Sequence, residues 1–321
     1  VIVVGDIHGN LTDLLHILDT YGMPSHTNRY VFNGDFVDRG DCGVEVMCIL
    51  LSLYRACPEY VTLNRGNHED RVINSVYGFQ QECTTKFDED IFNKMGTLFD
   101  CMPLFVMVEK MVFIVHGGLF IDRTVSFEDL DKINRFDDEC QAEVPYPQCL
   151  EMLDTAEEQW DAFGKELHRN AMWSDPRFEP GLEISHRGSG VLFGPDVAEE
   201  FMRNNNVKMI IRSHEVCKKG FYLPFGRTTN PALYNPSLPL LATIFSASNY
   251  SNSGNDAAVL VLMKRDHEDS HTVHGTHLHY SVHRFKTSQA DLATLEQSNR
   301  SSLSEMILKK KATLLAEFEV L

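Results

Sequence analysis

The chain has 321 residues, 43 % of them hydrophobic, and a formal net charge of −17 at pH 7. This length accommodates one large domain or two smaller ones around a sizeable core. The acidic balance argues against general binding to nucleic acid or to anionic membrane surfaces. No apolar stretch approaches the roughly 18 residues that a membrane-spanning helix requires.

Eight cysteines bear on the compartment in which the protein works. They form no C-x-x-C pair and have no regular spacing. We interpret them as reduced, mostly buried thiols of an intracellular protein of the cytoplasm, with the nucleus as an additional location. The sequence carries no signal-peptide pattern. It starts without Met inside an expected strand, so we expect further residues before Val1 in the natural chain.

Residues 1 to about 75 alternate between expected strands and helices. Strands are expected at 1–4, 30–33 and 61–64, with a helix after the first, where leucines recur at positions 11, 14, 15 and 18, and another at about 43–56. Such β-α-β units favour an α/β sheet. Gly, Asn and Asp follow the strands, where open α/β sheets usually place their ligand sites.

From residue 104 onward the sequence favours paired strands. Residues 104–108 and 111–115 flank Glu109-Lys110 and predict a hairpin. Later apolar runs lie at 209–211, 241–245 and 257–263, and the last two have no long helix between them. These runs favour a second, mainly antiparallel sheet, and hence a β-sandwich.

Two segments of biased composition are expected outside the core. Residues 122–172 are acidic and irregular and predict a surface insertion with a helix near 150–168. Residues 264–283 hold six of the 14 histidines, including His277 and His279 at strand spacing. A zinc site is one interpretation of this segment. A solvated hairpin is favoured, because His-rich tracts are only a compositional hint.

The C-terminal residues from about 302 predict a helix. Ser302 and Glu305 form a capping-box pattern. Apolar residues at positions 303, 307, 314 and 318 line one face of this helix. The simplest interpretation is a helix that docks on the core.

Five expected strands end in side chains that can bind a metal ion or a phosphate. Asp6 and His8 lie two residues apart, so on an extended segment they point the same way. Asp35 ends the next strand, where it can reach the same point and bridge a second ion. The candidate ligands are Asp6, His8, Asp35, Asn67, His116 and His214. One such residue alone would be explained by a turn or by packing, but six at successive strand tips predict a two-metal site. Carboxylate with imidazole suits Fe, Mn or Zn better than Ca.

The residues around these tips suit phosphate chemistry, because two ions about 3.5–4 Å apart would lower the pKa of a shared water and clamp phosphate oxygens. Arg39 can bind phosphate through two parallel hydrogen bonds. Asp38 can orient His68, which is then a candidate general acid for the leaving alkoxide. A sixth side-chain ligand or a structural histidine is the alternative for His68. Arg187 is a candidate second phosphate-binding arginine, and Tyr250 either contacts phosphate or packs in its loop.

Seven motifs occur in order between residue 1 and about residue 263. They are Gly-Asp-Ile-His-Gly, Gly-Asp-Phe-Val-Asp-Arg-Gly, Gly-Asn-His-Glu, His-Gly-Gly, Trp-Ser-Asp-Pro, Arg-Ser-His-Glu and Ser-Ala-Ser-Asn-Tyr. This series resembles the phosphoprotein phosphatase (PPP) family of serine/threonine phosphatases. The resemblance implies an α/β (α+β) fold, the calcineurin-like metallophosphoesterase β-sandwich of two mixed sheets flanked by helices. We accordingly expect a catalytic domain over 1–286, with the acidic insertion at about 122–172, and a helical extension over 287–321.

The resemblance also implies a role for each candidate residue. It puts Asp6, His8 and Asp35 on one ion, and Asp35, Asn67, His116 and His214 on the other, the ions being Mn or Fe with Zn. It makes His68 with Asp38 the proton-donating pair, and Arg39, Arg187, Tyr250 and Asn67 the substrate contacts. The expected reaction is direct attack of water on phosphoserine and phosphothreonine. The expected partners are therefore phosphorylated proteins.

Within the family, several runs look most like the EF-hand-containing (retinal degeneration C type) branch. They include Phe32–Asp35, Leu63–Asn67, Phe193–Asp196 and Ile211–His214. The segment Lys311–Glu319 resembles the entering helix of an EF-hand, although the sequence holds no D-x-[DN]-x-[DN]-G loop. Our hypothesis is that a longer natural chain continues into calcium-binding modules and that calcium or a calmodulin-type partner regulates it through segments outside this chain.

Two other functions remain open at this stage. One is a small-molecule phosphoesterase, such as a diadenosine-polyphosphate hydrolase, and the other is a catalytically dead, calcium-linked scaffold. The Trp-Ser-Asp-Pro and Ser-Ala-Ser-Asn-Tyr motifs favour the protein phosphatase over the first, and the complete ligand set disfavours the second. Residues 251–255 lack the acidic residue and the Cys or Tyr often found there in the family. Inhibitor sensitivity therefore does not carry over.

Overall fold

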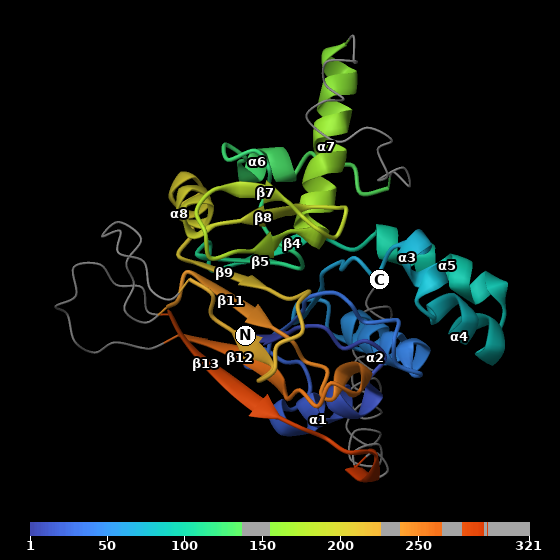
Figure 1. The fold of residues 1–321 in the computed structure, drawn as a ribbon. Helices are drawn as coiled ribbons and strands as arrows, with labels where there is room; N and C mark the ends of the chain where they lie inside the picture. The colour runs from blue at the N-terminus through green and yellow to red at the C-terminus, as the bar shows by residue number, and fades with distance from the viewer. Residues whose placement is uncertain (137–154, 226–237, 265–277, 292–293, 295–321) are drawn as a thin grey trace, which may run out of the picture.

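The computed structural model describes residues 1–136, 155–225, 238–264, 278–291 and 294. Two five-stranded sheets lie face to face, with helices on the outer face of each (Figure 1). The strands are β1 (Ile2–Val4), β2 (Tyr30–Phe32), β3 (Val61–Leu63), β4 (Phe105–Val108), β5 (Val112–Val115), β6 (Asp175–Pro176), β7 (Leu182–Ile184), β8 (Val191–Phe193), β9 (Met209–Arg212), β10 (Phe221–Tyr222), β11 (Leu241–Ile244), β12 (Ala257–Lys264) and β13 (Leu278–Phe285). The helices are α1 (Leu11–Tyr21), α2 (Gly43–Ala56), α3 (Arg71–Val76), α4 (Phe79–Lys86), α5 (Glu89–Asp100), α6 (Phe127–Leu130), α7 (Ala156–Trp173) and α8 (Pro195–Asn204), with 3-10 turns η2 (Tyr250–Asn252) and η3 (Gln289–Asp291).

The first sheet has the strand order β13-β12-β1-β2-β3. The strands β1, β2 and β3 are parallel, β12 pairs antiparallel with β1, and β13 pairs antiparallel with β12 at the edge of the sheet. Side chains alternate across the sheet: Val3 packs toward the second sheet, whereas Ile2 and Val4 pack with the helices α1 and α2. The predicted alternation of strands and helices in the first 75 residues is confirmed.

The second sheet has the order β10-β11-β9-β5-β4 and is mixed. Its three central strands are parallel and its outer pairs antiparallel. The predicted hairpin is present, and Glu109 and Lys110 at its turn have the positive φ angles (52° and 56°) that suit a two-residue hairpin turn.

The prediction of a mainly antiparallel second sheet is wrong. The apolar run at 257–263 lies in the first sheet, where β12 pairs with β1 and β13. An uninterrupted apolar run predicts a buried strand but does not specify its neighbours. The chain therefore crosses from the second sheet to the first between β11 and β12, and the loop that makes this crossing carries Tyr250.

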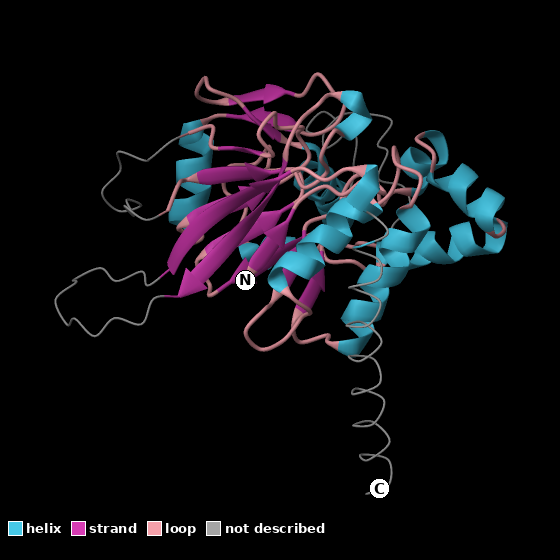
Figure 2. Ribbon diagram, turned by 90° about the horizontal axis from the view of Figure 1, so that it is seen from below, coloured by secondary structure: helices cyan, strands magenta, loops and turns pink. Residues whose placement is uncertain are grey.

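Helices cover both outer faces of the sandwich. Helices α1, α2, α4 and α5 share one apolar core with the outer face of the first sheet, and α7 and α8 share another with the second. The group α3–α5 projects to one side, at the right of both views (Figures 1 and 2). A small sheet of β6, β8 and β7 lies beside the second sheet (Figure 1).

The acidic segment 122–172 is more deeply integrated than a surface insertion. Its helix α7 begins at Ala156, and its C-terminal half is buried through Leu167, Ala171 and Met172. Val125 and Leu130 are buried as well. Acidic residues dominate the composition of the segment and so hide the apolar positions that pack, and residues 137–154 lie outside the described part.

Several other sequence predictions concern the periphery. Of the six cysteines that the structure describes, Cys83 and Cys217 are buried and the other four are partly or fully exposed, so the expectation of mostly buried thiols is wrong for these six. None of these six forms a disulfide with another described cysteine. His279 lies on β13, but His277 and the proposed tail helix lie outside the described residues. Among the described helices, none combines the length and the apolar character needed to cross a membrane.

Candidate active site

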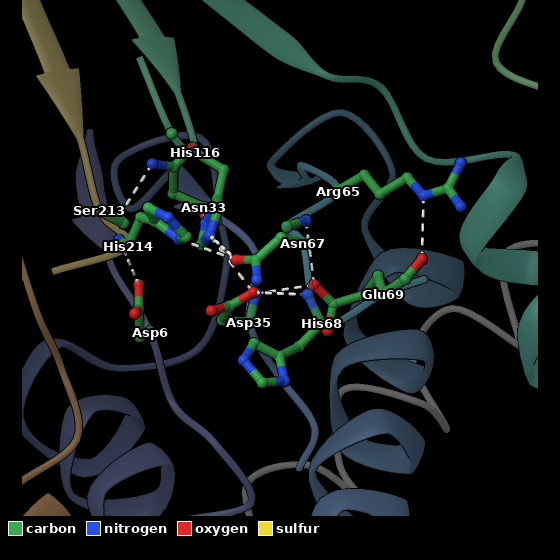
Figure 3. Close-up of polar contacts among 12 residues, drawn as sticks. Asp6, Asn33, Asp35, Arg65, Asn67, His68, Glu69, His116, Ser213 and His214 are labelled. Carbon is green, nitrogen blue, oxygen red and sulfur yellow. Dashed lines mark hydrogen bonds and ion pairs between the residues drawn. The ribbon is translucent and has the colours of Figure 1, made fainter. Parts of the chain in front are cut away.

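The loops that follow five strands meet at one place between the two sheets. Three follow the parallel strands β1, β2 and β3, and two follow β5 and β9 of the second sheet. Because parallel strands end at the same edge of a sheet, the loops converge there. Figure 3 shows the side chains that they bring together, and all six predicted ligands are buried.

Asp35 occupies the middle of this cluster. Its Oδ2 lies 3.4 Å from His8 Nε2, and its Oδ1 lies 3.3 Å from His116 Nε2. Oδ1 also accepts a hydrogen bond of 3.0 Å from the backbone N–H of His68. The two oxygens of one carboxylate thus face two histidines that come from different sheets.

The first-sheet side of the cluster holds Asp6 and His8. The Nδ1 of His8 lies 3.0 Å from the carbonyl oxygen of Val37, which leaves Nε2 directed at the cluster. This Nε2 is 3.7 Å from Asp6 Oδ2. The other oxygen of Asp6 accepts a 3.0 Å hydrogen bond from the backbone N–H of His214.

The second-sheet side is built around the amide of Asn67. Its Oδ1 lies 3.0 Å from His116 Nε2 and 2.8 Å from His214 Nδ1. The Nδ1 of His116 lies 2.7 Å from the carbonyl oxygen of Asn33, which again leaves Nε2 directed at the cluster.

These donors fit metal ions in two respects. Adjacent ligand atoms about 3 Å apart are what bonds of about 2.1 Å to a common cation require. In addition, Asp6 Oδ2 and His214 Nε2 are buried without a hydrogen-bond partner among the described residues. A buried polar atom without a partner is costly, and a cation beside Asp6 would remove that cost.

Two groups of three side chains in the described part of the chain place their ligand atoms within 4.8 Å of one another, and both lie here. One is His8, Asp35 and His68; the other is Asp35, His116 and His214. Asp6 belongs to neither group, and His68 belongs to the first. The alternative in which His68 is itself a ligand therefore stays open on geometry alone.

The pKa values of the cluster reflect dense charge in a buried place. Burial and, to a lesser extent, the charge of Asp35 together raise the pKa of Asp6 to about 7. Burial lowers the pKa of His8 to about 3. The pKa of His116 rises to about 9, since Asp35 and Asp6 outweigh the effect of burial. His116 thus acts as the positive partner of Asp35, a role that a metal cation would take over.

The predicted pair of His68 and Asp38 is in contact. His68 Nδ1 lies 2.6 Å from Asp38 Oδ2, and the second oxygen of Asp38 accepts a 2.9 Å hydrogen bond from the backbone N–H of Phe79. Burial would lower the pKa of His68, but the charges of Asp35 and Asp38 outweigh it and raise the pKa. A histidine whose protonated form is stabilised in this way, with Nε2 left over, is suited to donate a proton.

Arg39 and Tyr250 lie at the mouth of the cluster. The Arg39 guanidinium stacks 4.1 Å from the ring centroid of Tyr77, and the Tyr250 ring lies 4.9 Å from that of His8. Together with His8, both residues line a cavity of about 750 Å³. The structure therefore brings these two predicted substrate contacts beside the predicted ligands.

Arg187 approaches from the loop between β7 and β8. Its Nε donates a 2.5 Å hydrogen bond to Asp175, whose other oxygen accepts from the buried Arg212 at 2.8 Å. The pKa of His214 is held well below its usual range by burial, by His116 and by the charge of Arg187. Arg187 is thus anchored near the second-sheet histidines.

Glu69 lies beside this cluster, and the sequence suggested no role for it. It is fully buried, and its carboxylate accepts hydrogen bonds from the backbone N–H groups of Asp35 (2.7 Å), Phe36 (2.8 Å) and Gly66 (3.0 Å). One side chain thus fixes the two loops that carry Asp35 and Asn67. Its place directly after His68 in the strand-tip motif was the available signal.

Three further residues were given no contact of their own in the sequence analysis. Asn33 Nδ2 donates to the Val115 carbonyl (2.8 Å) and to Ser213 Oγ (2.9 Å), and so joins β2 to both second-sheet loops. Gly34 makes the close approach possible, since a Cβ there would lie 2.8 Å from His116 Nδ1. Asp13, buried on α1, holds the loop before Tyr250 through the backbone N–H of Ser248 at 2.6 Å.

Comparisons with known proteins agree with this geometry. The family described as calcineurin-like phosphoesterase matches residues 1–218. Serine/threonine-protein phosphatase T of Schizosaccharomyces pombe is 36 % identical over 267 residues, which cover 83 % of this chain and 50 % of the relative. Human serine/threonine-protein phosphatase 5 is 36 % identical over 265 residues, covering 82 % and 46 % respectively. The chain thus spans about half the length of these curated relatives or less.

A solved structure is similar over most of its length. It is a protein serine/threonine phosphatase from Saccharomyces cerevisiae, described as similar to human phosphatase PP5. The TM-score is 0.67 and the identity 31 %, with 90 % of this chain and 80 % of that chain covered. The predicted two-sheet fold and the resemblance to serine/threonine phosphatases are confirmed.

Proposed function

The chain belongs to the calcineurin-like phosphoesterase family, and we propose that it is the catalytic domain of a metal-dependent serine/threonine protein phosphatase. The observation that carries this proposal is the placement of Asp35. One carboxylate faces His8 at 3.4 Å and His116 at 3.3 Å, as a bridge between two cations requires. The relatives named above support phosphorylated proteins as substrates.

The chain's own residues supply binding and proton transfer. Arg39 and Arg187 bind the phosphate oxygens from two sides, and Tyr250 closes the site beside His8. The charge of Asp35 and the contact with Asp38 favour the protonated form of His68, and His68 gives its proton to the leaving alkoxide of serine or threonine. When bound, the metal ions activate the attacking water and neutralise charge on the phosphate.

The metal assignment has two parts. Asp6, His8 and Asp35 are proposed to hold one ion, and Asp35, Asn67, His116 and His214 the other. Two carboxylates, one amide and three imidazoles form a mixed oxygen and nitrogen set that suits Mn, or Fe with Zn, better than Ca. Titration of metal-free protein with each ion, followed by calorimetry, tests the preference.

Three finer points extend the proposal. The motifs around Asp35 and His214 support a place in the EF-hand-containing branch of the PPP family, with regulation by calcium or a calmodulin-type partner through residues outside this chain. Sequencing the coding region beyond Leu321 tests this, and a continuation without an EF-hand loop would contradict it.

The absence of a regular cysteine pattern supports a location in the cytoplasm or the nucleus. Imaging of a tagged natural chain tests this location.

The activity is tested with reconstituted protein. Metal-free protein is loaded with Mn²⁺ or with Fe and Zn and given phosphoserine and phosphothreonine peptides and, separately, diadenosine tetraphosphate. We expect phosphate release from the peptides, and in ¹⁸O-labelled water the label enters the released phosphate in a single turnover. Hydrolysis of the dinucleotide alone would favour the small-molecule phosphoesterase, and no hydrolysis of either would favour the scaffold.

A further inference from the structure

The cavity at the mouth of the site extends beyond the residues that a phosphate group needs. It measures about 750 Å³ and is lined by His8, Arg39 and Tyr250, but also by the segment Lys286–Ser288 that follows β13. Clefts of roughly 300–1,000 Å³ hold drug-sized ligands. One phosphoseryl side chain is much smaller than such a ligand, so the cavity has room for the residues beside it in a peptide.

The lining segment is fixed to the site by one buried carboxylate. Asp13 is fully buried, and its Oδ1 accepts hydrogen bonds from Thr287 Oγ1 (2.6 Å) and from Ser248 Oγ (3.0 Å). Its Oδ2 accepts from the backbone N–H of Ser248 at 2.6 Å. The segment after β13 and the loop that carries Tyr250 are thus held by the same side chain.

Lys286 gives this part of the cavity a positive charge. It is exposed, and its Nζ donates to the Gly254 carbonyl oxygen at 3.3 Å. Among the described residues it pairs with no carboxylate, whereas Lys86, Lys94 and Lys264 each do. In a chain with a net charge of −17, Lys286 thus adds to the positive charge that Arg39 brings to the lining of the same cavity.

We propose that the cavity is a substrate subsite for an acidic side chain next to the phosphorylated residue, with the Lys286 ammonium as its partner. The inference rests on the proposed phosphatase function and adds a preference among phosphopeptides. Asp41 also lines the cavity and is exposed. Its carboxylate repels an acidic residue, which confines the acidic side chain to the part near Lys286.

The test compares phosphothreonine peptides that are identical except for acidic, neutral or basic flanking residues. For the reconstituted wild type we expect kcat/KM for the acidic peptide to exceed that for the neutral one about two- to fivefold, as suits one exposed ion pair. Most of the difference falls in KM, because the contact exists before the chemical step. High salt reduces the ratio, since it screens an exposed pair.

Variants assign the preference to its residue. In Lys286→Met, we expect kcat/KM to be equal for the acidic and the neutral peptide. In Lys286→Glu, we expect kcat/KM to be higher for the basic peptide than for the acidic one. Lys94→Met, which changes the net charge equally but lies on α5, keeps the wild-type ratio. A wild type without the acidic preference, or a preference that survives in Lys286→Met, would overturn the proposal.

Two readouts separate this subsite from the phosphatase function itself. Hydrolysis of p-nitrophenyl phosphate, which has no flanking residues, reports on the catalytic centre alone in the wild type. Fluorescence anisotropy of labelled peptides reports on binding without turnover. The protein could hydrolyse neither substrate and still bind the acidic peptide more tightly than the neutral one, with a difference that is lost in Lys286→Met. This result would contradict the phosphatase function but support the subsite.

Discussion

The two sheets contribute to the centre in different ways. The first sheet supplies consecutive loops after β1, β2 and β3, and Glu69 binds the backbone of two of them. The second sheet supplies His116 and His214, which are positioned by residues distant in sequence, such as Asn33 and Asp6. One half is therefore built mainly by contacts among the first three strand-loop units, and the other by contacts between residues much farther apart in the sequence. Asp35 belongs to both, so changes at Asp35, at the proton donor and in each half should separate their roles.

Asp35→Asn removes the link between the halves and should have the largest effect. An amide has one oxygen and cannot serve two cations as a carboxylate does. We expect kcat for a phosphopeptide to fall by about 10³-fold or more, which corresponds to about 4 kcal/mol. The far-ultraviolet circular dichroism spectrum should stay unchanged, and a rate within tenfold of the wild type would refute the bridging role.

His68→Asn tests the proton donor and should lower kcat by about 10²–10⁴-fold for phosphopeptides. The loss should be much smaller for p-nitrophenyl phosphate, because its leaving group needs little protonation. Metal content, measured by mass spectrometry, should remain that of the wild type. Loss of an ion instead would show that His68 is a ligand, and a near-normal peptide rate would refute the acid role.

Glu69→Gln weakens the first-sheet half without replacing any of the predicted metal ligands. One of the three backbone hydrogen bonds is lost, because the new NH₂ group meets an N–H donor. We expect Mn²⁺ to bind about 10- to 100-fold more weakly in calorimetry. Glu82→Gln is the matched control, since Glu82 accepts from the backbone N–H groups of Gly43 and Val44 away from the centre. Equal Mn²⁺ affinities in Glu69→Gln and Glu82→Gln would contradict the proposed positioning role of Glu69.

Arg187→Ala addresses the second-sheet half and should have the smallest effect. Its side chain is 38 % exposed and held by Asp175, so its removal should leave metal content and fold intact. The loss of a charged phosphate contact should lower kcat/KM by about tenfold. Arg177→Ala, at a residue that directly follows β6 of the small sheet and pairs with Glu183, should retain wild-type kinetics. Equal kinetics in both variants would remove Arg187 from the site.

The same contrast explains what the sequence could reveal. An apolar run followed by Gly-Asp or Gly-Asn-His is local, so Asp35, Asn67 and His68 could be placed at strand tips from the sequence. The hairpin at Glu109-Lys110 and the helix at 43–56 were predictable for the same reason. Each depends on neighbours within a few residues.

Long-range partners were not predictable in this way. Asp13 contacts Ser248, 235 residues away, and nothing in helix α1 announces that contact. Strand β12 pairs with β1, which lies far away in the sequence, whereas the sequence analysis assigned its apolar run to the second sheet. The buried end of α7 was hidden by the acidic residues before it. A local sequence pattern thus predicts where helices and strands lie, whereas the partners that they contact depend on the whole fold.

The central claim is that two cations share the Asp35 carboxylate. Electron paramagnetic resonance of the protein loaded with Mn²⁺ tests it most directly, because two ions bridged by one carboxylate are magnetically coupled. We predict two Mn²⁺ per chain and a coupled spectrum that is lost in Asp35→Asn. A fully active wild type with one Mn²⁺, or with the uncoupled six-line spectrum of isolated ions, would contradict the account.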